Sequence, residues 1–431
     1  APYLGSRSGA RRGPAGAGEM MQELSRRDLL DLAARSGVAL GAAGLAGPLG
    51  AAFTPAALAA PPRHEKLSEL ARRAPVARYW TSSAAPTAAC TDCHEAAAIK
   101  GRSYVHRPAV VRCQLCAHEC TILPGERGRC RTRINTGGEL RTLVYGRPIT
   151  EQVDPIEKKP FYHFLPGAAA FSLATSGCPL HCRFCQNWEI SQAAPEAYAA
   201  VRRSAREMAD RAAARRAAVV AFTYNEPTVF IEYLVDIARA ARARGLRPVL
   251  VSCGFMNEAP LAEMIEVLDA IKIDLKGLSP EFYRKVTGAE LAPVLRSIRQ
   301  VARAGRHLEI VNLVVPTLND APEMLRELVR WVAGEVGPDV PLHFTRFHPD
   351  YQLLNLPPTP VATLEAAWEL ARGEGLRYVY VGNVPGHPGN HTHCPACGAI
   401  CIERRGFFTT AVRLRDGACT ACGARLAGVW S

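Results

Sequence analysis

Short apolar runs alternate with segments of helical period from Ala168 onward, and this alternation is the feature that most limits the fold. The runs that predict strands are residues 171–175, 219–223, 248–252, 271–275, 309–315 and 342–346, with a further run at 378–381. Helices are predicted between them, for example at 229–244, 323–335 and 363–372. Six βα units and a further strand predict an α/β fold, a partial parallel (β/α)6 TIM-type barrel with its active site at the carboxyl ends of the strands.

Polar residues follow the predicted strands at five of these carboxyl ends. They are the loop at 176–192, Tyr224-Asn225-Glu226-Pro227, Asp274 and Lys276, residues 312–320, and a group after the sixth strand made of His343, Arg346, His348, Asp350 and Tyr351. A single polar residue after a strand is usually a loop residue or a helix cap. Five such ends on one face of a barrel instead predict a functional site.

Three cysteines in the loop after the first strand carry the strongest chemical signal. Cys178, Cys182 and Cys185 are spaced C-x3-C-x2-C in SGCPLHCRFCQNWEISQ, with Phe184 just before the third. A four-iron cluster held by three thiolates keeps one iron free for a substrate, much as a catalytic zinc site keeps an open position. The alternative is part of a zinc site, but the tight spacing in a loop bounded by Gly and Pro favours the cluster.

Two further cysteine sets lie on either side of the predicted barrel, and both favour metal sites over disulfides in a chain of this length. Cys113, Cys116, Cys120 and Cys130 could close a tetrahedral shell around zinc or hold an auxiliary iron–sulfur cluster, and their spacing does not choose between these. Cys394, Cys397, Cys419 and Cys422 form two CxxCG knuckles, which predict a zinc-ribbon-like module. Cys253 is interpreted as an inert core thiol, and Cys401 as a packed spare.

The triad resembles the cluster motif of the radical S-adenosylmethionine (SAM) enzymes, and the predicted barrel is similar to the activating enzymes of the pyruvate formate-lyase type. Closer similarity is to the radical SAM enzyme of the AmmeMemoRadiSam system, carried by VDPIEKKPFYHFLPG, TYNEP, IDLKG, VVPTLND, HFTRFHPDY and YVGNVPGH. It runs from about Val111 to the C-terminus.

The resemblance implies a role for each matching residue. The triad would hold a [4Fe-4S] cluster that binds SAM, Phe184 would lie against the adenine, and Glu226 would meet the methionine ammonium. Asn225 belongs to the same motif, where Tyr224-Asn225 replaces the usual two glycines. Asp274 and Lys276 would lie along the methionine carboxylate and ribose, and His348 near the ribose. No residue is assigned a catalytic role beyond these contacts.

The predicted function is therefore reductive cleavage of SAM to a 5'-deoxyadenosyl radical, which abstracts hydrogen from an unknown substrate. The resemblance to the activating enzymes implies a protein substrate. The alternative is an exported iron–sulfur or haem electron-transfer protein without SAM chemistry. Expected partners are an electron donor and, by resemblance, Memo-type and AMMECR-type proteins. The excess of 52 Lys and Arg over 40 Asp and Glu is spread over helical faces, so no specific nucleic-acid site is expected.

The first part of the chain predicts export. Arg26-Arg27 precedes a weakly apolar stretch and Ala57-Leu58-Ala59, an order typical of a twin-arginine signal, with cytoplasmic location as the alternative. Cys90, Cys93 and His94 form a CxxCH segment, which could attach haem, ligate a metal or stay unligated. No transmembrane segment is expected beyond the signal.

The sequence predicts five divisions of the chain. They are 1–60 (start and signal), 61–110 (linker with CxxCH), 111–167 (Cys-rich segment), 168–385 (barrel) and 386–431 (zinc-ribbon-like module).

Overall fold

The computed structural model describes residues 65–82, 109–199 and 201–431. The predicted export signal, most of the predicted linker and the Cys90, Cys93 and His94 segment lie outside the described residues. In the described part of the chain, no helix is both long enough and apolar enough to cross a membrane.

One eight-stranded sheet forms the centre of the fold, in the order β13-β12-β11-β10-β9-β8-β7-β6. Neighbouring strands from β7 to β13 are parallel, whereas β6 runs antiparallel to β7. The strands are β6 Thr150–Pro155, β7 Ala169–Ala174, β8 Val219–Phe222, β9 Arg247–Ser252, β10 Ala270–Asp274, β11 His307–Val314, β12 Leu342–Arg346 and β13 Val379–Gly382. The six predicted strands and the further one are confirmed. The edge strand β6 was not predicted, because TEQVDP contains no apolar run.

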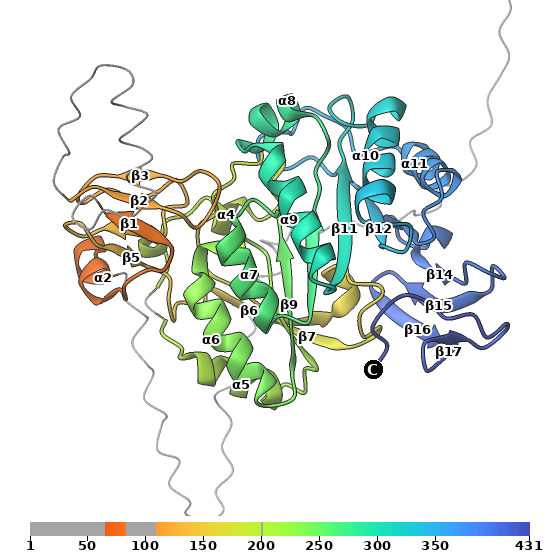
Figure 1. Cartoon of the computed structure of the whole chain (residues 1–431), viewed down its shortest axis with the longest axis horizontal. Helices are drawn as coiled ribbons and strands as arrows, with labels where there is room; N and C mark the ends of the chain where they lie inside the picture. Colours follow the sequence, from red (N-terminus) through yellow and green to blue (C-terminus); the bar gives the residue numbers. More distant parts are fainter. Residues whose placement is uncertain (1–64, 83–108, 200) are drawn as a thin grey trace, which may run out of the picture. The chain divides into compact units, whose positions relative to one another are not determined.

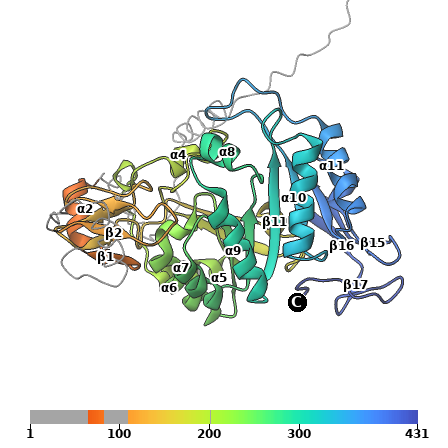
Figure 2. The same cartoon turned by 45° about the horizontal axis from the view of Figure 1, so that its top comes forward.

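Helices connect the parallel strands and pack on the outside of the sheet, as both views show for α6, α7, α9 and α10 (Figures 1 and 2). They are α5 Ala205–Ala214, α6 Ile231–Arg242, α7 Glu258–Val267, α9 Leu291–Arg303, α10 Pro322–Glu335 and α11 Val361–Gly373, with short helices α4 Trp188–Ser191 and α8 Pro280–Phe282 near the triad. The start of α5 is fixed by a capping box, in which Ser204 and Glu207 each accept the other's backbone N–H. The α/β class and the parallel sheet are thus as predicted.

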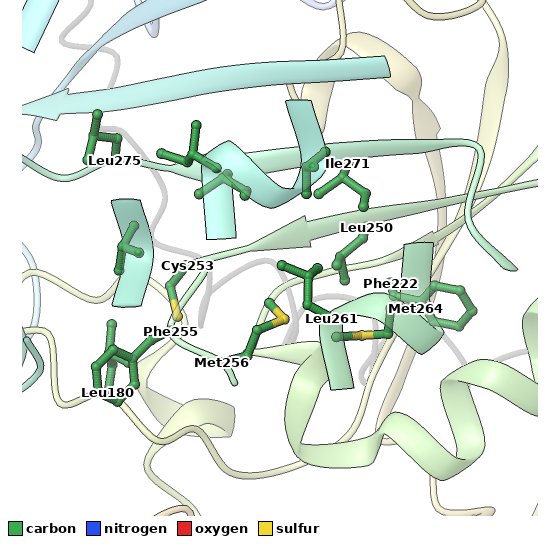
Figure 3. Close-up of a cluster of buried hydrophobic side chains, with 14 of the residues drawn as sticks. Leu180, Phe222, Leu250, Cys253, Phe255, Met256, Leu261, Met264, Ile271 and Leu275 are labelled. Atoms are coloured by element: carbon green, nitrogen blue, oxygen red, sulfur yellow. The ribbon is translucent and has the colours of Figure 1, made fainter. Parts of the chain in front are cut away.

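Alternating strand residues divide the packing into an outer and an inner layer. On the outside, Phe222, Leu250 and Ile271 pack with Leu261 and Met264 of α7, and all five side chains are fully buried (Figure 3). On the inside the strands carry small residues, namely Ala170, Val219, Ala221, Val249 and Ala270. These leave room that a segment from outside the barrel fills.

That segment is residues 156–167, called the strap below, which follows β6. Ile156, Phe161 and Phe164 are fully buried among the small inner residues of β7 to β10. The strap therefore fills the inside of the barrel at the amino ends of the strands.

The C-terminal module (residues 386–431) packs against the strap. It contains β14 Thr392–His393, β15 Ile400–Arg405, β16 Phe408–Val412, β17 Leu414–Arg415 and β18 Ala418–Cys419. Phe164 and Val429 form a parallel bridge, with Leu165 N–H donating to Val429 O at 2.8 Å. Arg404 donates to Tyr162 O at 2.7 Å. The module therefore lies on the side of the sheet where β6 and β13 are not paired with each other.

A smaller unit precedes the barrel. It consists of α2 Leu67–Arg73, β1 Trp80–Ser82, β2 Val111–Cys113, β3 Thr121–Ile122, β4 Arg133–Asn135 and β5 Leu140–Thr142, in which β1, β2 and β3 form an antiparallel sheet and β4 pairs with β5. Arg133, which is fully buried, pairs with Glu232 of α6 at 2.5 Å. Removing one partner of such a buried pair costs several kcal/mol, so this ion pair fixes the unit to the barrel.

Candidate functional site

A cavity of about 520 Å³ opens at the carboxyl ends of the strands, where the sequence predicted the site. Every predicted cofactor contact except His348 lines it: Cys178, Cys182, Phe184, Cys185, Asn225, Glu226, Asp274 and Lys276. These residues come from the loops after β7 and β8 and from β10 and its following loop. His348, after β12, is exposed and is not among the lining residues.

The loop that carries the triad (residues 175–187, the triad loop) is fixed at several backbone positions. His181 and Arg183 donate backbone N–H groups to Thr287 O and Val286 O, both at 2.9 Å. Asn225 donates to Gly177 O at 2.8 Å. Cys182 is 9% exposed, and Cys178 and Cys185 are partly buried. The three thiols are therefore held by the protein itself in positions facing the cavity.

The sulfur spacing distinguishes kinds of metal site. Among the described residues, Cys394, Cys397, Cys419 and Cys422 are the one set of at least three Cys, His, Asp or Glu ligand atoms that all lie within 4.8 Å of one another. Four thiolates on one zinc ion lie about 3.8 Å apart, given a Zn–S distance of about 2.3 Å. In a four-iron cluster each thiolate binds a different iron, so the sulfurs lie farther apart. The triad does not belong to such a tight set of sulfurs.

Glu226 is the most constrained acid of the cavity. Its side chain accepts the Thr228 hydroxyl at 2.6 Å, the Cys253 backbone N–H at 2.7 Å and the Ser252 hydroxyl at 2.9 Å. Glu226 is 2% exposed. The neighbouring Asn225 Oδ1 is buried and has no hydrogen-bond partner in the described structure.

Asp274 lies between two lysines. Lys276 Nζ is 3.2 Å from Asp274 Oδ2, and Lys272 pairs with the other carboxylate oxygen. Burial alone would raise the pKa of Asp274, but the two ammonium groups lower it to about 2. The site therefore carries a permanent carboxylate with one excess positive charge beside it.

Phe184 lies next to this charged group. Its ring is 5.5 Å from Lys276 Nζ and stacks on Phe282 with ring centres 6.4 Å apart. It is 5% exposed, so its position is fixed from behind by α8. A flat apolar surface beside a cation is what a purine ring and its ribose would meet here.

Several lining residues were not recognised in the sequence. Cys253, interpreted as an inert core thiol, lines the cavity next to Cys178 and Glu226. Lys272 lies in the middle of the apolar strand β10 and points inward, and a lysine in such a run was the available signal. His343, which the sequence analysis placed among the polar residues of the sixth strand end, lines the cavity as well. Asn312 and Asn319, at the fifth strand end, instead stabilise the loops by donating to Leu275 O and Lys276 O.

Below the cavity, polar groups of the barrel interior are paired with one another. Glu309 accepts His343 Nε2 at 2.7 Å and the backbone N–H groups of Tyr162 and His163 at 2.8 to 3.0 Å. Burial would raise the pKa of Glu309, but its hydrogen bonds to His307 and His343 hold it well below its usual range. Glu309 thereby joins the strap to β11 and β12.

The strap and the C-terminal module close the other side of the cavity. Lys158 and Lys159 of the strap and Gly406 and Phe407 of the β15–β16 hairpin are among the lining residues. Lys159 pairs with Asp154 at 2.6 Å, and burial lowers the pKa of this lysine to about 8.

The C-terminal cysteines lie in the arrangement that two knuckles predict. Cys394 Sγ is 3.6 Å from Cys422 Sγ, and Cys397 Sγ is 3.9 Å from Cys419 Sγ. Each knuckle closes through a glycine N–H that donates to its first cysteine, Gly398 to Cys394 O at 2.9 Å and Gly423 to Cys419 O at 2.8 Å. The four sulfurs are thus preformed for a single tetrahedral metal ion.

Residues 172–332 match the family described as the radical SAM superfamily. The chain is 42% identical over 318 residues to the uncharacterised protein MJ0808 of Methanocaldococcus jannaschii, a match that covers 73% of this chain and 95% of that protein. It is 26% identical over 177 residues to a pyruvate formate-lyase-activating enzyme of Listeria monocytogenes, covering 38% of this chain and 68% of that enzyme. Among solved structures, SuiB of Streptococcus suis bound to S-adenosylmethionine has a TM-score of 0.40 at 12% identity, over 53% of each chain.

Proposed function

The chain belongs to the radical SAM superfamily and is an enzyme with radical SAM chemistry, and we propose on that premise that it acts on a protein substrate as the activating enzymes do. In this proposal the triad holds a [4Fe-4S] cluster, SAM binds in the cavity, and hydrogen is abstracted from the substrate. The observation that carries the proposal is that the three thiols and the five predicted SAM contacts, which come from the carboxyl ends of β7, β8 and β10, all line one cavity.

The residues present fit the two cofactors. The three thiols that line the cavity can hold a four-iron cluster with one iron free for SAM, and the carboxylate of Glu226, which also lines the cavity, suits the ammonium group of SAM. The positive charge left over at Lys272 and Lys276 suits the carboxylate of SAM. When bound, the cluster supplies one electron that cleaves SAM to methionine and a 5'-deoxyadenosyl radical.

The protein's part is to orient the cofactor and to keep water away. Glu226 is held by donors of three residues, Thr228, Ser252 and Cys253, which fix its orientation when SAM is absent. Phe184 offers an apolar wall fixed by Phe282. The strap and Phe407 border the cavity on the side where β6 and β13 are unpaired. A radical formed there would be enclosed by this chain on most sides.

The finer assignments are part of the same proposal. We propose a structural zinc ion for the four C-terminal cysteines, on the basis of their sulfur distances. Membership of the AmmeMemoRadiSam system, with Memo-type and AMMECR-type partners and an electron donor, rests on the quoted sequence segments. Export stays a prediction, since the residues of the signal lie outside the described part. The electron-transfer alternative finds no support in the comparisons.

The test is anaerobic reconstitution of the full chain with iron, sulfide, reductant and SAM, followed by chromatographic assay of 5'-deoxyadenosine. The wild type is expected to form it, and Cys182→Ala is expected to form none. Equal amounts from both proteins, or none from a wild type that has bound its iron, would refute the proposal.

A further inference from the structure

The four N-terminal cysteines, whose metal the sequence left open, occupy one site in the small unit before the barrel. Cys113 ends β2 and donates its backbone N–H to Cys120 O at 3.0 Å, and Cys116 lies in the turn between them. The loop that leads to Cys130 approaches Cys120, because a Cβ on Gly128 would lie 3.7 Å from Cys120 Sγ. All four pack in the same apolar core as the triad.

Their arrangement differs from that of the C-terminal set. Among the described residues, the four C-terminal sulfurs lie within 4.8 Å of one another, and the four N-terminal cysteines do not belong to such a set. The N-terminal thiols are therefore not already gathered around the position of a single metal ion, as the C-terminal thiols are.

A buried cation without a full set of partners lies beside the site. Arg133 is fully buried, and its charge interacts with Cys113 and Cys130 as well as with Glu232. Its terminal nitrogens donate to Arg78 O and to Glu232, but its Nε–H has no partner in the described structure. A donor left over in a buried place next to sulfur suits N–H···S hydrogen bonds, which tune iron–sulfur clusters.

The site also contacts the triad loop directly. Gly177 precedes Cys178 and has φ +86°, and a Cβ on it would lie 2.4 Å from Cys130 O and 2.3 Å from the Thr132 side chain. On the other side of Cys178, Pro179 O accepts a hydrogen bond from His118 Nε2 at 2.9 Å. The backbone around Cys178 is thus held between Cys130 and the loop of Cys116 and Cys120.

We propose that Cys113, Cys116, Cys120 and Cys130 bind a second [4Fe-4S] cluster, placed against the triad loop. None of the four is among the residues that line the cavity, so this cluster has no access to substrate and serves as a one-electron carrier. It takes one electron from a low-potential one-electron donor protein and passes the same electron on to the radical SAM site, so it is unchanged over a turnover. The carrier role rests on the proposed function, whereas the metal content does not.

The test measures iron, acid-labile sulfide and zinc in the full chain, reconstituted anaerobically, together with EPR spectra of the reduced protein with and without SAM. Three double variants are compared with the wild type: Cys113→Ala/Cys116→Ala, Cys182→Ala/Cys185→Ala and Cys394→Ala/Cys397→Ala. We expect about eight irons in the wild type, about four in each of the first two variants, and about eight in the third, which alone loses zinc.

The spectra separate the two clusters from each other. In Cys182→Ala/Cys185→Ala the remaining signal should be unaffected by SAM, and the reduced wild type should show spin–spin broadening that both single-cluster variants lack. A wild type with about four irons and about two zinc ions would overturn the proposal, as would a triad variant without iron. If the N-terminal variant does not fold, the metal contents of the wild type and of the triad variant still test whether the second cluster exists. If the EPR spectrum of the reduced wild type does not change when SAM is added, the proposed function is refuted, whereas the proposal of a second cluster is not.

Discussion

Arg404 lies over the ring of Tyr162, with its guanidinium carbon 4.1 Å from the ring centre. The same side chain donates to Tyr162 O and lies 3.8 Å from the fully buried Glu157 of the strap. The C-terminal module and the strap are therefore joined by a buried cation, and the cavity that both border depends on this contact.

Replacing Arg404 by Ala should destabilise the module by about 3 kcal/mol, because Glu157 would be left as a buried charge without its cation. Urea unfolding and limited proteolysis within residues 386–431 measure the effect. Arg413→Ala removes an ion pair to Glu403 whose side chains are 49% and 42% exposed, and it should change stability by at most about 0.5 kcal/mol. Equal losses in the two variants would contradict the role given to Arg404.

Glu226→Gln should weaken SAM binding about 10- to 100-fold, since a charge-assisted hydrogen bond contributes about 1.5 to 3 kcal/mol. The exchange keeps the size of the side chain but removes the charge that faces the cavity. Calorimetric titration of the reconstituted protein with SAM measures it. Glu327→Gln, an exposed acid on α10, is the control and should bind SAM as the wild type does. An unchanged affinity in Glu226→Gln would exclude the predicted contact to the ammonium group.

Gly177→Ala should lower the iron bound at the triad. The left-handed backbone and the contacts of 2.3 and 2.4 Å leave no room for a methyl group, so the triad loop must move away from Cys130. Gly245→Ala is the matched control, with φ +72° but no atom within 4 Å of the added carbon, and should cost only about 1 kcal/mol of backbone strain. Iron content and melting temperature distinguish a displaced loop from strain alone, and full iron loading of Gly177→Ala would contradict the close approach.

Acid should lower the stability of the C-terminal module because His163 is buried in its neutral form. This ring lies between Ala427 O and the Tyr380 hydroxyl, and burial lowers its pKa from 6.5 to about 3. Below pH 6.5 the unfolded chain binds a proton that the folded chain does not, so stability falls as the pH drops toward 3, by at most about 1.4 kcal/mol per pH unit. His163→Asn should show a shallower decline in melting temperature, whereas the exposed His348→Asn should follow the wild type. If the melting temperatures of all three proteins fall equally as the pH is lowered, His163 is not the cause of the acid destabilisation.

Loss of the C-terminal metal should open the cavity on one side. Cys397→Ser should bind no zinc and become sensitive to protease in residues 386–431, because the β15–β16 hairpin that brings Phe407 to the cavity belongs to the same module. Cys401→Ala is the control: this buried thiol is outside the set of four, so zinc should stay bound. Retention of zinc by Cys397→Ser would contradict the proposed ligand set.

The sequence was sufficient for the sheet and for the strand ends, because hydrophobic periods and the polar residues after each run depend on local order alone. The sequence did not predict which residues near the strand ends line the cavity and which are buried in the core or exposed. Cys253 follows an apolar strand like any core thiol, and only the position of that strand beside Glu226 brings it to the cavity. His348 shows the opposite, since it occupies a matching position in the motif but is exposed. The strap appeared in the sequence only as a segment that carries the family resemblance, and its place among Ala170, Val219 and Ala221 depends on long-range packing.

The bridge between Phe164 and Val429 has a consequence for biogenesis. Contacts between residues so far apart in the chain form late, because the loop between them must close first. During synthesis the residues of the barrel are made before Val429, so the strap can form this bridge only after the barrel strands have been synthesised.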